Sequence, residues 1–441
     1  MKNELLKLGH SIVRDPKYGK NPIHFITKVL SIREQYGEII ENSFRGDKNF
    51  HRALKEAFEK FLNVNKTPAR YLSMYVDLFM KGKIAADRHE RSSRRHCHLD
   101  RVIEIFRYLH NRDVFAYFYK TTLAERLLSS RSSSDSDERG MITRLKTECG
   151  YQYASKMEGM WKDIKNISQE VNQRFEKWLR RNRSDDDGVK INIRVLTTGF
   201  WPTNNIESDH TILPDSVVSC CKHFEKFYHT HFTGRRLVWN KRMGQAVLYY
   251  QMSNKKQKEL LVTAYQMCVL MLFNDEGTVK LTTSQIESKT KIPRAELNRH
   301  LASLCTEKCQ LLRSRKMSPT ERSYSLNSKF QNQKYRIKVP LLKRKLGSSS
   351  SSLESSGSEK SSGIPRGVIQ ERQCLLDANI VRVMKSRLTM AHNALVAEIT
   401  RQVQSRFRPT PQDIKKRIEN LISREYLKRS KDDDRIYNYI S

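Results

Sequence analysis

Apolar residues recur at the spacing of an α-helix through most of the first 180 positions of the chain. The segments with this spacing are 23–40, 49–62, 71–80, 99–109, 141–161 and 164–179. Asp47 precedes the second segment and is a candidate N-cap, because a carboxylate accepts hydrogen bonds from the free N–H groups of a first turn. Long helices joined by short connections are typical of a helical bundle.

The pattern changes after a charged stretch at 180–188. Residues 191–197 alternate in polarity and are rich in β-branched side chains, which predicts a strand. A helix at 214–232 and further short strands are expected to follow, the strands at 237–239, 246–250 and 259–262. Together these elements predict a small α/β unit.

Residues 263–340 show the order of elements of a winged helix. Helices are expected at 265–273 and 294–304, and Pro293 suits a helix start because its missing N–H has no partner there. Strands at 310–313 and 335–339 are expected to form the wing. The last part repeats this plan, with helices at 370–386, 393–406 and 411–425 and a hairpin around 432–434.

The predicted fold is mainly α with a small α/β unit: a helical bundle followed by an α/β domain and two winged-helix domains. The serine- and glycine-rich stretch 348–363 predicts a flexible linker between the winged helices. The expected divisions are 1–66, 67–185, 189–262, 263–340, 341–367 for the linker, and 368–441 for the second winged helix.

The composition is strongly basic. Lys and Arg number 82 and Asp and Glu 48, a net charge of +34, which favours acidic partners such as nucleic acid, an anionic membrane or an acidic protein segment. No apolar run approaches the ~20 residues of a membrane span, and the first residues do not form a secretory signal. The eight cysteines lack regular spacing, so we expect reduced thiols and a location in cytoplasm and nucleus.

No cofactor and no metal site is expected. Cys220 and His223 would share a helix face, but their spacing fits no structural zinc pattern. Cys149 lacks the neighbouring His and acid that would activate a thiolate as nucleophile. We therefore expect both cysteines to be ordinary thiols of packed helices.

One lysine near the C-terminus stands beside an apolar stripe. Ile380, Val383 and Met384 follow helical spacing and should pack inward, which places Lys385 at the surface. Arg382 and Arg387 lie nearby and could attract a partner that is acidic there.

Five segments, in order along the chain, carry a family resemblance. They are 115–128 (FAYFYKTTLAERLL), 141–150 (MITRLKTECG), 195–202 (VLTTGFWP), 380–387 (IVRVMKSR) and 414–427 with the last strand 437–440. Each resembles a motif of the cullins, and the resemblance runs from about residue 20 to the end. Within the family, the chain is most similar to cullins that use BTB-type adaptors.

The resemblance implies a non-catalytic scaffold of a multisubunit cullin–RING ubiquitin ligase that serves ubiquitin-dependent protein catabolism. Lys385 would form an isopeptide bond with a ubiquitin-like modifier of the Nedd type. The implied partners are a RING-box protein and, through it, a ubiquitin-conjugating enzyme. The RING-box protein would add a strand to the α/β unit 189–262. The residues expected to bind it are Ile193, Val195, Leu196, Thr197 and Trp201.

The linker suggests how the modification could act. About 20 flexible residues have an r.m.s. span of about 25 Å, so a modified winged helix could swing between docked and open states. The conjugate would free the RING-box protein to bring the conjugating enzyme towards substrate.

Two departures leave alternatives open. Residues 1–66 resemble the end of the last N-terminal helical repeat, so the BTB-adaptor surface is expected to be missing and the chain could be a truncated, non-productive or dominant-negative paralogue. Alternatively, the cations Lys415, Lys416 and Arg417 could make the second winged helix a nucleic-acid-binding module. The acidic residues at 432–434 would face the phosphates and argue against this reading.

Overall fold

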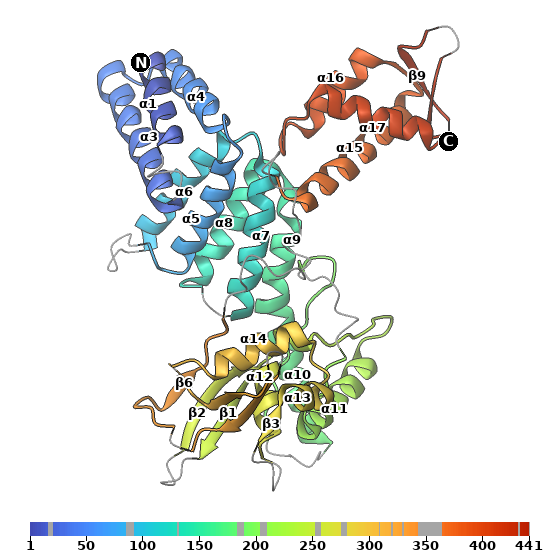
Figure 1. Cartoon of the computed structure of the whole chain (residues 1–441). Helices are drawn as coiled ribbons and strands as arrows, with labels where there is room; N and C mark the ends of the chain where they lie inside the picture. The colour runs from blue at the N-terminus through green and yellow to red at the C-terminus, as the bar shows by residue number, and fades with distance from the viewer. Residues whose placement is uncertain are drawn as a thin grey trace. The chain divides into compact units, whose positions relative to one another are not determined.

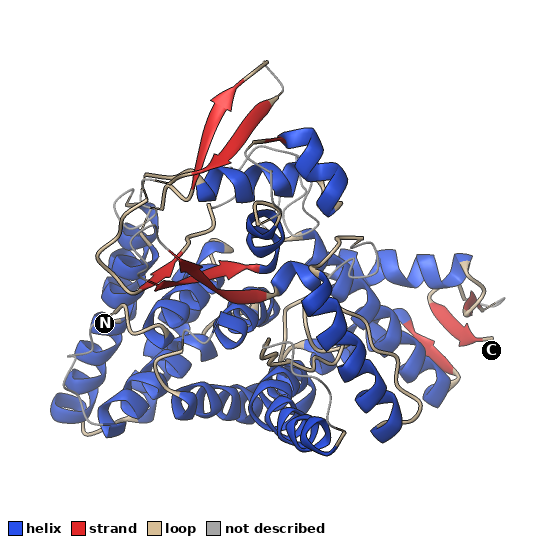
Figure 2. Cartoon of the chain, turned by 90° about the horizontal axis from the view of Figure 1, so that it is seen from below, coloured by secondary structure: helices blue, strands red, loops and turns tan. Residues whose placement is uncertain are grey.

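The computed structural model divides the chain into two compact units (Figure 1). The first comprises Met1–Ser168, Arg194–Pro202 and Ser356–Ser441, and the second comprises Gln169–Ile193 and Thr203–Ser355. The structure describes residues 1–15, 21–84, 92–129, 132–182, 189–202, 210–251, 257–274, 280–307, 309–318, 321–328, 330–342, 364–430 and 433–440. Helices dominate over strands, which confirms the predicted fold class (Figure 2).

The first unit begins with a long series of helices. They are α1 (Lys2–Arg14), α3 (Pro22–Phe44), α4 (Lys48–Leu62), α5 (Thr67–Met80), α6 (Ser92–Arg107), α7 (Arg112–Ser129), α8 (Asp135–Cys149), α9 (Tyr151–Lys162) and the π-helical turn η1 (Asp163–Ile167). Asp47 caps α4 as expected, its carboxylate accepting from the Asn49 N–H at 2.7 Å. The expected single helix at 141–161 is wrong, because Gly150 at φ +84 breaks it into α8 and α9.

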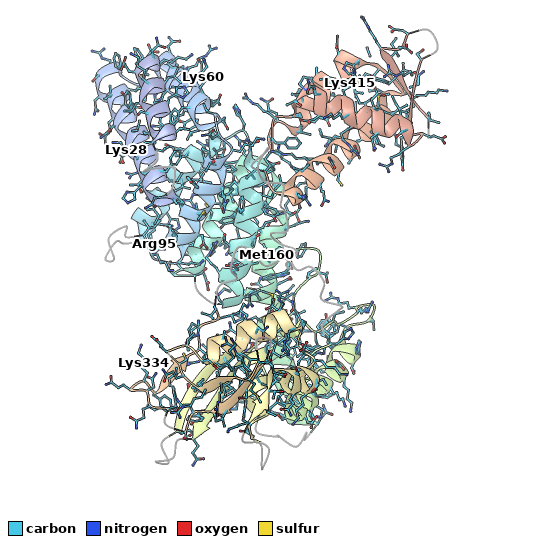
Figure 3. All side chains as sticks on the ribbon, in the orientation of Figure 1. Lys28, Lys60, Arg95, Met160, Lys334 and Lys415 are labelled. Carbon is cyan, nitrogen blue, oxygen red and sulfur yellow. The ribbon has the colours of Figure 1, made fainter. Side chains whose placement is uncertain are left out.

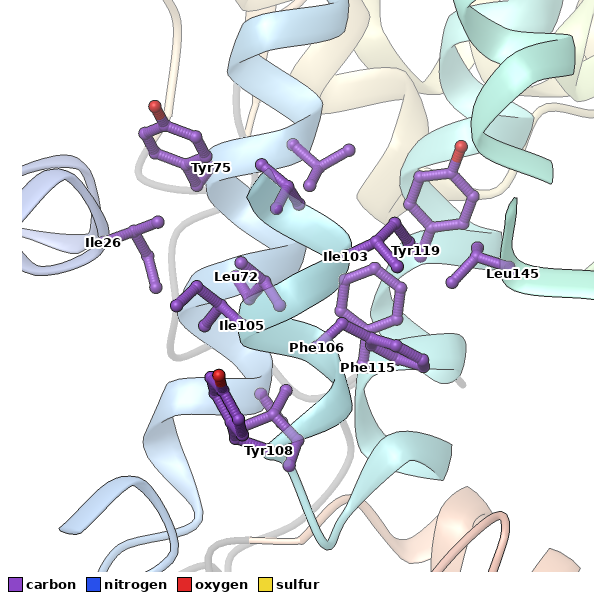
Figure 4. Close-up of a cluster of buried hydrophobic side chains, with 14 of the residues drawn as sticks. Ile26, Leu72, Tyr75, Ile103, Ile105, Phe106, Tyr108, Phe115, Tyr119 and Leu145 are labelled. Carbon is purple, nitrogen blue, oxygen red and sulfur yellow. The ribbon is translucent and has the colours of Figure 1, made fainter. Parts of the chain in front are cut away.

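These helices share one hydrophobic core. Charged side chains such as Lys60 lie outside the ribbons (Figure 3), whereas the inward faces are aromatic and aliphatic (Figure 4). The Phe106 and Phe115 rings meet edge to face with centroids 5.0 Å apart. Tight interdigitation of this kind is the main source of stability for a helical unit.

One ion-pair cluster lies inside the same core. The Arg126 side chain is fully buried, and its guanidinium donates to Glu138 at 2.5 and 2.9 Å and to Asp77 at 2.7 Å. Tyr119 and Ser132 donate their hydroxyls to the same Glu138 carboxylate. A buried charge requires such pairing because it has given up its hydration.

The C-terminal part of the first unit is a winged helix with its own core. Its elements are α15 (Arg366–Arg387), β7 (Thr389–Ala391), α16 (His392–Val403), α17 (Pro411–Ser423), β8 (Leu427–Arg429) and β9 (Ile436–Tyr439). The strands form an antiparallel sheet in the order β7–β9–β8. Thr410 begins α17 with a reciprocal capping box to Asp413. These elements confirm the second winged helix.

The second unit contains the α/β elements and the first winged helix. Its elements are α10 (Ser168–Arg181), α11 (Asp215–His231), η2 (Lys241–Met243), β1 (Gln245–Gln251), β2 (Gln257–Thr263), α12 (Ala264–Met271), β3 (Leu281–Thr282), α13 (Thr283–Thr290), α14 (Arg294–Leu304), β4 (Leu312–Lys316), β5 (Arg322–Leu326) and β6 (Arg336–Lys338). They form two sheets, β1–β2–β6 and β3–β5–β4.

The predicted wing of this winged helix is partly wrong. The wing is formed by β4 and β5, which pair antiparallel with Leu312 opposite Leu326. The expected second wing strand, near 335–339, instead forms β6 and pairs in parallel with β2. The segment at 322–326 has one buried apolar residue, Tyr324, so its polarity pattern gave no strand signal. The expected strand at 237–239 is also absent from the described residues.

The expected division into six segments stays a prediction. Most of the expected linker lies in 343–363, outside the described residues, as do 431 and 432 at the wing tip. Within the described part of the chain, no helix is long and apolar enough to cross a membrane.

Candidate functional site

Lys385 lies in the last turn of α15, and its side chain is exposed. Ile380 and Met384 are fully buried in the core of the C-terminal winged helix, and Val383 is nearly so. The expected inward stripe is therefore confirmed, and it fixes the direction of the lysine. Among the described residues, no carboxylate lies within hydrogen-bonding or ion-pairing distance of its amine.

The two neighbouring arginines differ in their surroundings. Arg382 donates to the amide oxygens of Asn379 and, at 3.0 Å, Gln402, so its guanidinium is held against its own module. Arg387 is exposed at the end of α15. Both arginines expected to attract an acidic partner are exposed next to Lys385.

The segment expected to be a strand at 191–197 contains no strand. In the first unit, side chains of the helical part hold its backbone: the Val195 N–H donates to the Ser168 hydroxyl at 3.0 Å, and the Thr197 N–H donates to Asp163 Oδ2 at 2.7 Å. Trp201 is buried, and its indole N–H donates to the same carboxylate at 2.8 Å. The strand prediction is wrong because side chains, not a neighbouring strand, satisfy these N–H groups.

Ile193 belongs to the second unit. Its N–H donates to Asn172 Oδ1 at 2.9 Å, and its carbonyl accepts from Asn172 Nδ2 at 2.6 Å. The Asn172 amide thus supplies the donor and acceptor that a neighbouring strand would supply. Of the five expected residues, the structure gathers Val195, Leu196, Thr197 and Trp201 on the first unit.

Asp163 is the residue of this site that sequence reasoning missed. It is 1 % exposed and accepts three hydrogen bonds from the segment, two from Thr197 and one from Trp201. It follows the buried Met160 by three positions, so it lies on the inward face of its helix. A carboxylate on an apolar stripe was the available signal.

The first turns of α15 pack against the helical part of the first unit. Val368 joins the core of that part, and Arg372 donates to Asp113 and, at 2.9 Å, to the Asn111 side chain. The Arg372 guanidinium also lies 4.6 Å from the centroid of the Phe407 ring, in the C-terminal winged helix. Arg372 therefore contacts both the helical part and the C-terminal winged helix of the unit, a role that no periodicity in the sequence indicates.

Three family models match successive stretches of the chain. The cullin alpha solenoid domain matches residues 1–172, the cullin alpha+beta domain matches 195–330, and the cullin protein neddylation domain matches 371–433. The chain belongs to the cullin family. The family resemblance of the sequence is thereby confirmed.

Two curated cullins illustrate the similarity. Cullin-3 of Dictyostelium discoideum is 35 % identical over 472 residues, covering 99 % of this chain and 59 % of the relative. Cullin-3A of Arabidopsis thaliana is 37 % identical over 449 residues, covering 100 % of this chain and 58 % of the relative. The similarity to Cullin-3 proteins agrees with the resemblance to BTB-adaptor cullins, and the chain spans less than two thirds of these relatives.

The cullin domains give each candidate residue a place. Lys385 lies within the match to the neddylation domain, and Val195 begins the match to the alpha+beta domain. Cys149 lies within the solenoid match, and burial raises the pKa of its thiol. A thiol with a raised pKa is a poor nucleophile at neutral pH. Among the described residues, no cluster of His, Cys, Asp or Glu could hold a metal ion.

The basic helix of this cullin's C-terminal module has carboxylate partners of its own. Arg417 donates from Nε to Asp377 at 2.7 Å, and Arg429 of the adjoining strand pairs with Glu419 at 2.6 Å. Lys415 and Lys416 remain exposed. Internal pairing reduces the positive charge that this helix could offer to phosphates.

Proposed function

We propose that this cullin is the non-catalytic scaffold of a cullin–RING ubiquitin ligase and that Lys385 accepts a Nedd-type modifier. The observation that carries the proposal is the exposed Lys385 amine at the end of α15, within the neddylation-domain match. The buried stripe beside it fixes the helix, so the lysine is presented on a rigid element rather than on a loop.

The reaction requires mainly that the acceptor amine be accessible to the thiolester. The neutral Nζ of Lys385 attacks the carbonyl carbon of the thiolester between modifier and conjugating enzyme. The N–C bond forms, the C–S bond breaks, the enzyme's cysteine leaves as thiolate, one amine proton passes to solvent, and the other stays on the isopeptide nitrogen. Attack succeeds when the reacting atoms come within about 3–3.5 Å, which an exposed side chain without a described carboxylate partner permits.

The RING-box protein is proposed to bind by adding a strand to extended backbone of this cullin. In the first unit, the N–H groups of Val195 and Thr197 point towards the helical part. Because successive residues of an extended chain alternate, the N–H and carbonyl of Leu196 point the opposite way, and among the described residues neither has a hydrogen-bond partner. That outer side supports strand addition.

The second unit offers an extended edge of its own. Strand β1 is at the end of the sheet order β1–β2–β6, and no described strand pairs with its outer side. Val247 and Tyr249 on β1 are exposed aliphatic and aromatic side chains. An unpaired edge with apolar side chains is a receptive site for another chain.

The test is co-purification from cells with wild-type chain, Lys385→Arg and the matched control Lys415→Arg, which replaces another exposed lysine of the same module. Wild type and Lys415→Arg should show a second band heavier by one modifier, and Lys385→Arg should show none. All three should retain the RING-box protein. If the Lys385→Arg chain is still modified, another lysine is the acceptor. If the RING-box protein is absent from every sample, the proposal that the chain is a scaffold is refuted.

The adaptor is a separate proposal. The similarity to Cullin-3 proteins supports a BTB-type adaptor, but the chain spans only 58–59 % of those relatives. A pull-down with BTB proteins distinguishes the two forms of the scaffold. If a BTB protein binds, the chain can assemble a ligase with both adaptor and RING-box protein. If the chain binds the RING-box protein but no BTB protein, it acts as a dominant-negative cullin.

A further inference from the structure

The helix that carries Lys385 ends in an unusual backbone conformation. Leu388 follows the last residue of α15 at φ +62 and ψ −45. The helix ends at Arg45 and Lys291 also have positive φ, but their ψ values of 34 and 25 lie in the ordinary left-handed well. Leu388 lies outside that well, near the rare and strained γ-turn region.

The surrounding structure holds both peptide groups of this residue. The Leu388 N–H donates to the Met384 carbonyl at 2.7 Å, and the Leu388 carbonyl accepts from the Tyr439 N–H at 2.8 Å. The next residue begins β7, where the Thr389 hydroxyl donates to Asn438 at 2.8 Å. A strained conformation persists when its neighbours over-determine it in this way, and such residues cluster at functional sites.

Packing does not explain a leucine here. Its side chain is 63 % exposed, and the core of the module is closed by other residues. Ile440, which follows the hydrogen-bonded Tyr439 in sequence, is 48 % exposed. Two aliphatic side chains are thus exposed to solvent in the module that carries Lys385. A Gly would fit the backbone with less strain, so a leucine at this position requires another reason.

We propose that Leu388 is an apolar docking contact for the conjugating enzyme that delivers the modifier to Lys385. This inference rests on the proposed function. The lysine amine must reach the thiolester carbonyl, so the enzyme surface around its active-site cysteine must cover the residues within one helical turn of Lys385. Leu388 directly follows the helix, three residues after Lys385 in the sequence. Its side chain is exposed, so that surface can bury it.

The chemistry around the lysine favours an apolar contact. The exposed charges next to it are Arg382 and Arg387, and no carboxylate of the described chain pairs with Lys385. Cations can attract an enzyme from a distance, but they hold it weakly once solvent and salt screen them. Burial of one leucine side chain adds short-range affinity at a defined place. Leu388 therefore positions the enzyme and takes no part in the chemical step.

The test is transfer of the modifier from the thiolester-charged enzyme to the full chain in complex with RING-box protein, over a range of enzyme concentrations. Leu388→Asn replaces the apolar side chain with a polar one of similar shape, and Leu388→Met keeps an apolar side chain of similar size. We expect Leu388→Asn to lower kcat/KM about ten-fold, mainly through KM, and Leu388→Met to stay within about two-fold of wild type. Thermal unfolding of Leu388→Asn should not be lowered.

Each outcome separates the possibilities. If wild type is modified at Lys385 and Leu388→Asn is modified equally well, the docking contact is wrong and the proposed function stands. If Leu388→Met loses as much kcat/KM as Leu388→Asn and both unfold earlier, Leu388 has a structural role and the inference is also wrong. If wild type accepts no modifier at Lys385, the proposed function fails and the inference fails with it.

Discussion

Replacement of Arg126 by leucine tests the reasoning about the core most directly. The guanidinium is fully buried and gives three close hydrogen bonds, two to Glu138 and one to Asp77. Asp77 keeps a second cation, because Lys81 lies 2.6 Å from it. Glu138 keeps hydroxyl donors from Tyr119 and Ser132 but loses its counter-charge. The perturbation therefore leaves one buried carboxylate without a cation.

The magnitude follows from that uncompensated charge. Removal of one partner of a buried ion pair costs about 3–5 kcal/mol in the free energy of unfolding. For a unit of this size, each kcal/mol lowers the melting temperature by about 2–4 °C, so Arg126→Leu should melt about 10 °C earlier. The double replacement Arg126→Leu with Glu138→Leu removes both charges and should recover more than half of the loss.

The assay is thermal and denaturant unfolding of the full chain, followed by hydrogen exchange in peptides from α7 and α8. Arg101→Leu is the matched control, since Arg101 forms an exposed ion pair with Glu34 at 2.7 Å and its removal should leave stability nearly unchanged. The reasoning is refuted if Arg126→Leu behaves like Arg101→Leu, or if the double replacement costs as much as the two single replacements together.

Three further predictions concern other parts of the chain. Burial lowers the pKa of His300 from 6.5 to about 4, so the unfolded chain takes up this proton at a higher pH than the folded chain. The free energy of unfolding should therefore fall by about 3 kcal/mol as the pH drops from 6.5 to 4. His300→Gln should reduce this pH dependence, which is measured by unfolding at several pH values with hydrogen exchange of α14. Asp163→Ala removes the acceptor of three hydrogen bonds, so amide exchange should accelerate at 195–201 and the RING-box protein should be lost; unchanged exchange there would contradict the anchoring role. Arg372→Ala should accelerate exchange in the first turns of α15, whereas the control Arg382→Ala, whose contacts lie within its own module, should leave those turns protected.

The sequence predicted those features that depend on local spacing. Helices such as α4 and α15 bury residues three and four positions apart, so their existence and the outward direction of Lys385 could be inferred from neighbours in sequence. Pairing partners could not be inferred, because a strand pattern does not specify which strand it meets; β6 joined β2 instead of the wing for this reason. The anchors Asp163 and Arg372 act through polar contacts to residues distant in sequence, which periodicity does not encode.

Helix α15 also joins two hydrophobic cores of the first unit. One end, at Val368, belongs to the core of the helical part, and the other, at Met384, belongs to the core of the winged helix. Between the anchor Arg372 and Lys385 the helix rises 385 − 372 = 13 residues, or about 20 Å. The helix is continuous between the two cores, so a change in its direction near Arg372 would carry Lys385 with it. A tilt of about 10° at the anchor would carry the lysine about 3.5 Å. This displacement is as large as the separation of about 3–3.5 Å at which two reacting atoms meet.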